Sequence, residues 1–113
     1  MERDKYILLF PLTLNDGSVV PQAVLNEFKD ELFVIAGGYT ITGTVEGAYR
    51  IKSGKKQLDK LLQIWVCPEK ESVAELLRVV AVYAERLGQE SMYFERTGGT
   101  VELLTPLRAG GAK

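Results

Sequence analysis

Residues 37–51, GGYTITGTVEGAYRI, lie where the hydrophobic pattern of the chain changes period. Before them, apolar residues recur at helical spacing over residues 24–35, and the Gly37-Gly38 pair supplies the left-handed conformation that ends a helix. From Tyr39 to Ile51 the period becomes two, which predicts a long, half-buried strand. The stretch therefore predicts a helix that passes directly into a strand.

The sequence on both sides extends this order of elements. Residues 6–12 and 60–67 are short and apolar on both alternating faces, which predicts two strands that are covered on both sides. Ser72-Val73-Ala74-Glu75 has the pattern of a capping box, and an apolar helical stripe follows it as far as Gly88. Residues 91–96 alternate as a fourth strand, and Gly98-Gly99 can turn the chain back into an extra C-terminal strand over 100–104.

The resulting order, β-α-β-β-α-β, is typical of an α+β ferredoxin-like plait, an antiparallel sheet with two helices on one face. In such a plait the first and third strands are central, and the second and fourth lie at the edges. A chain of 113 residues builds one core. We therefore expect a single domain over residues 1–107 and a disordered tail over 108–113, because the tail has nothing to bury.

Composition argues against several classes of site and partner. The chain has no histidine and one cysteine, which excludes a Ser-His-Asp triad, a His-ligated metal and an internal disulfide, so we expect no cofactor and no metal. Its 14 basic and 15 acidic side chains create no overall field for a nucleic-acid backbone, so no nucleic-acid partner is expected. The N-terminal residues lack the features of a secretory signal, and no apolar stretch is long enough to span a bilayer. These features favour a cytoplasmic protein without a membrane partner.

The sheet face turned away from the helices, here called the open face, is predicted to be apolar. An uncovered antiparallel face is normally polar, yet both central strands carry apolar residues on both faces. Leaving several such side chains in water would forgo several kcal/mol at about 25 cal/mol per Å². We therefore predict a homodimer formed sheet to sheet, or else a C-terminal hairpin that folds over the same surface. The predicted interface residues are Leu61, Gln63, Trp65 and Tyr93.

Two glycines in the second strand suggest a small-molecule pocket. Gly43 and Gly47 are predicted on the inward face of this strand, where they leave space between the sheet and the helices beside Tyr39 and Tyr49. Close approach of a helix, or coiling of the strand, is the simpler explanation of these glycines. Glu46 and Arg50, predicted on the other face, could orient a substrate or form an exposed ion pair. The predicted ligand-binding set is Tyr39, Gly43, Gly47, Tyr49, Glu46 and Arg50.

Four lysines form the main cationic cluster of the sequence, on the turn between the second and third strands. Lys52, Lys55, Lys56 and Lys60 could bind phosphate or an acidic partner. The alternative is a solvated turn whose charges prevent edge-to-edge aggregation.

Several short motifs resemble a family of small bacterial proteins known only as a domain of unknown function. They are Gly37-Gly38-Tyr39-Thr40, Gly47 followed by Tyr49, and Gly88-Gln89-Glu90-Ser91 after the second helix. The resemblance implies a plait fold and carries no established catalytic residues.

Two functional hypotheses follow from the sequence. The first is a non-enzymatic homodimeric domain for binding or assembly, which associates through its open face. The alternative is a cofactor-independent enzyme or small-ligand binder, similar in architecture to the dimeric α/β-barrel monooxygenases and muconolactone-type isomerases. The missing histidine counts against catalysis, because such chemistry often needs a base that titrates near neutral pH.

Overall fold

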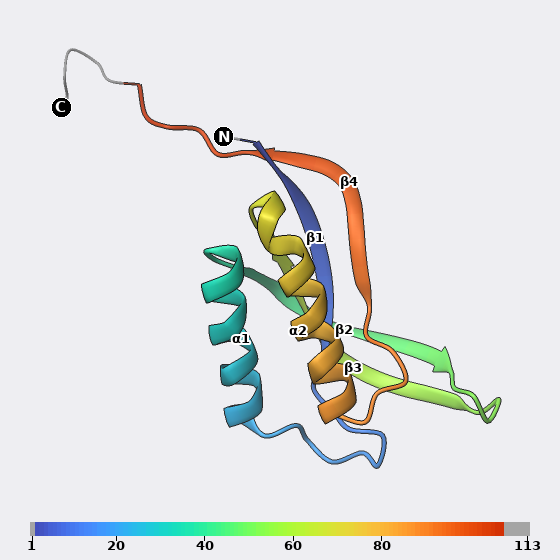
Figure 1. The fold of residues 1–113 in the computed structure, drawn as a ribbon. Helices are drawn as coiled ribbons and strands as arrows, with labels where there is room; N and C mark the ends of the chain where they lie inside the picture. Colours follow the sequence, from blue (N-terminus) through green and yellow to red (C-terminus); the bar gives the residue numbers. More distant parts are fainter. Residues whose placement is uncertain (1, 108–113) are drawn as a thin grey trace.

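The computed structural model describes residues 2–107, and its elements follow the predicted order. They are β1 (Glu2–Pro11), α1 (Gln22–Ala36), β2 (Thr40–Arg50), β3 (Lys56–Val66), the short 3-10 helix η1 (Lys70–Ser72), α2 (Val73–Arg86) and β4 (Phe94–Glu102). The four strands form one antiparallel sheet in the order β2-β3-β1-β4, with both helices on one face (Figure 1). The predicted ferredoxin-like plait, with β1 and β3 at its centre, is confirmed.

The core lies between this sheet and the two helices. Alternate residues of β1 face the helices, and Leu8 and Phe10 are fully buried there. Phe10 packs on Phe28 of α1 with ring centroids 4.6 Å apart, and Phe28 meets Tyr83 of α2 edge-on at 4.9 Å. Three aromatic rings from three elements therefore fix how the helices sit on the sheet. Neither helix of the described part has the length and apolar character needed to cross a membrane.

The two helix boundaries differ in how well the sequence predicts them. Gly37 ends α1 in the left-handed conformation, with φ of 78°, and its N–H donates to the Phe33 carbonyl as expected. The predicted capping box at Ser72 is wrong. Ser72 closes η1, where its N–H donates to the Glu69 carbonyl, and its side chain makes no capping hydrogen bond.

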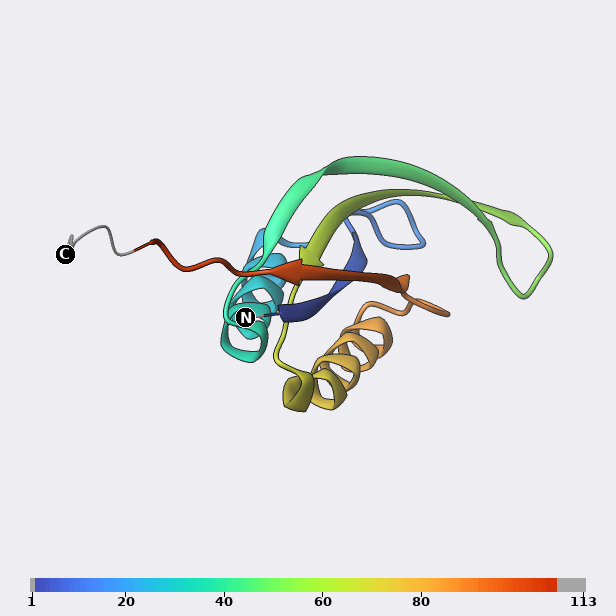
Figure 2. The same ribbon diagram turned by 90° about the horizontal axis from the view of Figure 1, so that it is seen from above.

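The predicted extra C-terminal strand is also wrong. β4 runs without a turn from Phe94 to Glu102 and pairs with β1 along its length. Between Arg96 and Thr100 it holds two more residues than β1 does, and Gly98 takes a positive φ of 78° in this bulge. The Gly98-Gly99 pair therefore bends one strand instead of joining two. The chain after β4 leads away from the body, so residues 103–107 do not cover the open face (Figures 1 and 2). The predicted disordered tail, 108–113, lies outside the described residues.

A bulge in β2 reverses the predicted faces of most of this strand. Ile41 pairs with Ile64, but the next pair is Gly43 with Gln63, so Thr42 is an extra residue. One extra residue moves every later side chain to the opposite face. Gly43 and Gly47 therefore lie on the open face, and not on the face toward the helices as predicted. Val45 and Tyr49 lie there too, whereas Thr44, Glu46 and Arg50 share the other face.

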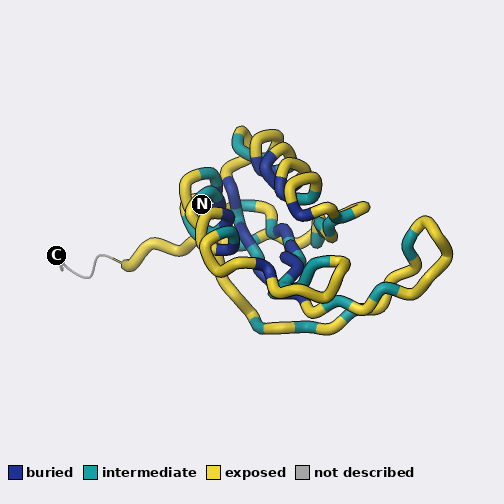
Figure 3. Tube along the Cα trace, turned by 90° about the horizontal axis from the view of Figure 1, so that it is seen from below, coloured by how far each residue is buried: buried dark blue, intermediate teal, exposed yellow. Residues whose placement is uncertain are grey.

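The β2–β3 hairpin extends beyond the helices and curves (Figure 2). The molecule measures 63 × 29 × 23 Å, and its radius of gyration is 16.7 Å. A compact chain of this length would have a radius of gyration of about 13 Å. Partly buried and exposed residues alternate along the hairpin (Figure 3). In β2, the open-face residues Val45 and Gly47 are partly buried, whereas Glu46 and Ala48, which alternate with them, are exposed. The open face is thus the concave side of a bent sheet.

Candidate functional site

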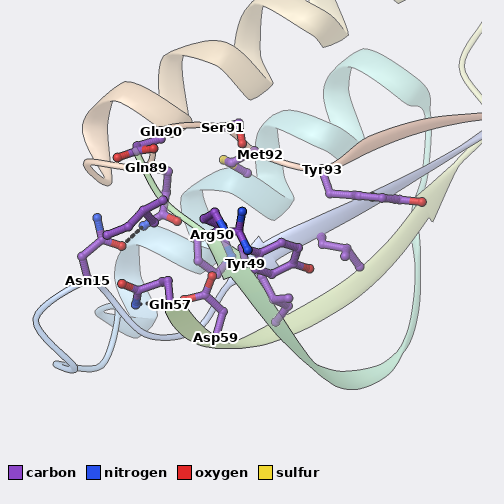
Figure 4. A pocket seen from close by; sticks show the side chains of 14 residues that line it. Asn15, Tyr49, Arg50, Gln57, Asp59, Gln89, Glu90, Ser91, Met92 and Tyr93 are labelled. Carbon is purple, nitrogen blue, oxygen red and sulfur yellow. Dashed lines mark hydrogen bonds between the residues drawn. The ribbon is translucent and has the colours of Figure 1, made fainter. Parts of the chain in front are cut away.

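The concave open face contains a hollow of about 280 Å³ at the far end of the hairpin. It lies between residues 49–51 and 57–61 of the hairpin and residues 89–93, which connect α2 to β4 (Figure 4). Segments that are distant in the sequence therefore meet around one space, because the hairpin curves toward the end of α2.

The floor of the hollow is apolar and comes from the two central strands. Leu9 and Pro11 of β1 and Leu61 of β3 face it, and Pro11 pairs directly with Leu61. Leu61 is only 6% exposed, although no helix covers this face. The curvature of the sheet and the neighbouring side chains shield it.

Two tyrosines border the hollow. The ring of Tyr49 folds back along β2 over Gly47, so the space predicted beside that glycine is filled by its neighbour's ring. Tyr93, just before β4, donates its hydroxyl hydrogen to Glu95 Oε1 at 2.8 Å. This hydrogen bond, followed by burial, raises the pKa of Tyr93 above its usual value of 10.0. The phenol therefore stays protonated and engaged with Glu95, and its ring remains available to a ligand.

Amide and carboxylate groups form the rim. Gln57 Nε2 donates to Asp59 Oδ1 at 3.4 Å, and Gln89 Nε2 donates to Asn15 Oδ1 at the same distance (Figure 4). Asn15 Nδ2 in turn donates to the Gly88 carbonyl at 3.0 Å. The two contacts of Asn15 join the β1–α1 loop to the end of α2, and together with Gln57 and Asp59 they place polar groups around the hollow.

Glu90 ties the end of the hairpin to the body of the protein. Its Oε1 and Oε2 lie 3.1 and 3.4 Å from the Lys52 backbone nitrogen, which donates to the carboxylate. Gly88, with φ of 66°, turns the chain out of α2 and so places Glu90 beside the hairpin. The sequence placed Gln89 and Glu90 after a helix-ending glycine, but Lys52, whose N–H donates to Glu90, is 38 residues away in the sequence.

The structure brings only some of the predicted ligand-binding residues together. Tyr49 lines the hollow and Gly47 makes room for its ring, while Arg50, on the other face of β2, borders the hollow at the edge of the sheet. Glu46 points to the opposite face, and Tyr39, just before β2, lines a separate depression with Trp65. Gly43 forms the bulge. The predicted location between sheet and helices is corrected to the open face, whereas the binding role of these residues stays a prediction.

The four residues predicted for the dimer interface do share the open face. Gln63 pairs with Leu9, Trp65 pairs with Ile7, and Lys5 Nζ lies 4.8 Å from the centre of the Trp65 ring. Gln63 Nε2 donates to Thr42 Oγ1 at 2.9 Å, across the β2 bulge. The face is therefore apolar at its centre and lined by polar side chains. Residues 2–107 contain no cluster of three or more side chains suited to hold a metal ion.

Comparison with known proteins supports the fold and no specific family. No protein-family model matches the chain, and no curated protein matches it significantly. The resemblance to a domain of unknown function stays a prediction. Among solved structures, the chain is similar to a phage SAM lyase in complex with S-methyl-5'-thioadenosine, with a TM-score of 0.65 and 14% identity. The match covers 88% of this chain and 85% of that chain. At this identity the likeness establishes the α+β plait alone.

Proposed function

We propose that this chain binds a small molecule of the nucleoside class in the hollow on its open face. The observation that carries the proposal is the combination of an apolar floor, two tyrosine rings and a hydrogen-bonding rim in one concave space. Small-molecule sites in proteins have this make-up, mostly apolar walls with a few placed polar groups, and volumes from about 300 Å³ upward. The hollow, at about 280 Å³, is close to the lower end of this range.

The lining chemistry favours a nucleoside over a purely apolar ligand. Tyrosine rings provide flat faces on which a base can stack. The amides of Gln57 and Gln89 can donate to and accept from the edge of a base. Asp59 and Glu90 supply carboxylates, the group that commonly accepts hydrogen bonds from ribose hydroxyls. The phage SAM lyase with the same fold was solved with S-methyl-5'-thioadenosine, which is itself a nucleoside thioether and gives a natural first probe.

Titration calorimetry with S-methyl-5'-thioadenosine and with adenosine tests the proposal. We expect saturable binding, and we expect Asp59→Asn and Tyr49→Ala each to weaken it by about tenfold, because each change removes one polar or stacking contact. Glu46→Gln is the matched control, because Glu46 lies on β2 but on the opposite face, and it should bind like the original protein. No binding of either probe, or binding that ignores both pocket variants, would refute the proposal.

The same samples separate a binding protein from an enzyme. After prolonged incubation, a binding protein returns the nucleoside unchanged, whereas a cofactor-independent enzyme converts it. Chromatography of the nucleoside after incubation therefore tests the enzymatic alternative, because a converted probe would show catalysis.

A second candidate is assembly of two copies through the open face. Ile7, Leu9 and Trp65 lie together there, partly buried, and no second layer of the described chain covers them. Packing two such faces would remove this apolar area from water. Light scattering should then report twice the mass of one chain, and Trp65→Glu should return it to a monomer. An unchanged size for Trp65→Glu would exclude this interface.

A further inference from the structure

The end of the β2–β3 hairpin is strongly basic in a chain whose net charge is −1. Residues 50–60, here called the hairpin arm, hold five basic side chains and one acidic side chain, Asp59. All five basic residues are exposed, and none of the ion pairs found among residues 2–107 involves a lysine of the arm. The basic residues are Arg50, Lys52, Lys55, Lys56 and Lys60.

An acidic surface lies at the opposite end of the molecule. A hollow of about 380 Å³ is bordered there by the start of β1 and by the segment that leads into α2. Its lining carries four acidic side chains and two basic ones, and this lining is here called the acidic hollow. The acidic residues Glu2, Asp4, Glu69 and Glu71 are all exposed. Figure 2 shows the N-terminus and the tip of the hairpin at opposite ends of the sheet.

The arm of one chain does not reach the acidic hollow of the same chain, because the sheet holds the two at its opposite ends (Figure 2). The two surfaces are opposite in charge and different in shape. Contact between unlike surfaces on identical chains is heterologous, and it joins copies head to tail.

Exposed leucines on the same two parts of the molecule provide an apolar component. Leu58 lies on the outer face of the arm, opposite Ala48, and is 67% exposed. The chain that follows β4 leaves the body near the N-terminus, with Leu104 83% and Leu107 94% exposed (Figure 2). A contact over the outer face of the arm would remove Leu58 from water.

We propose that this protein self-associates head to tail, with the hairpin arm of one copy docked on the acidic hollow of the next. Lys56 and Lys60, on the outer face of the arm with Leu58, face the acidic residues, and Leu58 packs beside the C-terminal leucines. This interface uses the outer face of the arm, with Lys56, Leu58 and Lys60, whereas Gln57 and Asp59 of the same arm lie on its other face and line the hollow. It is therefore distinct from a sheet-to-sheet dimer through the open face.

Charge reversal and mixing test the proposal on the full chain. One variant carries Lys56→Glu and Lys60→Glu in the arm, and the other carries Glu2→Lys and Glu71→Lys at the acidic hollow. All four positions are exposed, and circular dichroism with a thermal melt checks that each variant is folded. Light scattering at tens of micromolar protein should give more than the 12.6 kDa of one chain for the original protein, and 12.6 kDa for each variant alone.

The decisive sample is an equimolar mixture of the two variants. In the mixture each arm meets a hollow of opposite charge, so association should return. Salt should weaken association of the original protein, because the screening length falls from about 14 Å at about 0.05 M to about 4 Å at about 0.5 M. The Trp65→Glu variant should still associate, because it changes the open face and neither of the two docking surfaces.

Three results would overturn the proposal. One is an original protein that is monomeric at both salt concentrations. This includes a monomer that binds a heparin column, because the arm would then bind a polyanion and not a second copy of the chain. Another is variants that associate alone as the original protein does. The third is a mixture that stays monomeric although both variants are folded.

Discussion

The ring of Tyr49 lies over Gly47, its second neighbour along β2. A β-carbon at position 47 would stand 2.5 Å from the Tyr49 hydroxyl oxygen and 2.6 Å from a ring carbon. Any side chain at position 47 would therefore displace the ring. An aromatic side chain that covers a glycine of its own sheet is a known way to stabilise a bent strand. Here it also places the ring at the border of the hollow.

Replacing this glycine should move the ring without unfolding the protein. In Gly47→Ala the clash involves the far end of a side chain that is 42% exposed, so the ring can swing outward. We expect a change in unfolding free energy below about 1 kcal/mol, and nucleoside affinity lowered about as much as in Tyr49→Ala. Thermal unfolding and calorimetry measure the two quantities. Gly38→Ala is the control, since its β-carbon would meet nothing within 4 Å. Unaltered affinity in Gly47→Ala would show that the ring position does not matter for binding.

The contact between α1 and α2 should make stability depend on pH. Tyr83 Oη donates to Glu27 Oε2 at 2.8 Å and lies near Glu31 as well, and Arg86 forms an ion pair with Glu27. Hydrogen bonds from Arg86 and then from Tyr83 hold the pKa of Glu27 below its usual value of 4.5. A carboxyl group with a lowered pKa stabilises the folded state fully above its unfolded pKa, and this contribution is lost as pH falls through the folded pKa.

Glu27→Gln should therefore lower the melting temperature at about pH 7, and this effect should shrink as the pH falls through the lowered pKa of Glu27, because the original carboxyl then becomes protonated too. Melting curves at several pH values measure this difference. Glu85→Gln, on the exposed surface of α2, is the control, because no ion pair of the described residues involves it. An equal fall in melting temperature at all of these pH values would mean that the charge on Glu27 does not stabilise the contact.

The bulge in β4 should depend on Gly98 more than on Gly99. Gly98 has φ of +78° and a β-carbon there would meet nothing within 4 Å, so a substitution is opposed by backbone conformation alone. In this left-handed region of φ, a residue with a side chain is less stable than glycine by about 1–2 kcal/mol. Urea unfolding of Gly98→Ala should therefore show a free energy of unfolding that is lower by about 1–2 kcal/mol. Gly99→Ala is the matched control, since its β-carbon would stand at an ordinary 3.6 Å from Thr97 Oγ1. Equal effects of both changes would argue that the bulge is not strained at position 98.

The thiol of Cys67 should react slowly. Burial is the main cause that raises the pKa of Cys67 above its usual value of 9.0, and the nearby charges of Lys5 and Arg3 offset it only in part. A raised pKa leaves less thiolate, which is the reactive form. Alkylation by iodoacetamide at about pH 8 should therefore be several-fold slower in the folded chain than in urea-unfolded chain. Faster reaction in the folded chain would indicate an activated cysteine.

The sheet topology and part of the open face could be predicted from local patterns. Helical spacing ended by Gly37, and runs that are apolar on both faces, are properties of neighbouring residues, and they led to the correct β-α-β-β-α-β order. The alternation of Leu62, Ile64 and Val66 also gave the correct face of β3, so Leu61, Gln63 and Trp65 were expected on the open face, where the structure places them.

The hollow could not be predicted in the same way. Threonines and glycines alternate along β2, and neither type marks which face is buried, so the bulge at Thr42 left no trace in the pattern. The capping box at Ser72 failed for a different reason. In a capping box the glutamate accepts from the serine N–H, but the Ser72 N–H already donates to the Glu69 carbonyl in η1. Asn15, Asp59 and Glu90 looked like ordinary turn or surface residues until the bent hairpin placed them beside one another.

By itself, the sequence determined the kind and order of the elements, the central strands and the absence of histidine chemistry. Periodicity and composition act over a few residues and need no knowledge of distant parts of the chain. Only the tertiary structure decided which face of β2 meets the hollow, how far the hairpin bends, and that the basic and acidic surfaces lie at opposite ends. These features depend on register and curvature, which arise when strands far apart in the sequence pair with one another.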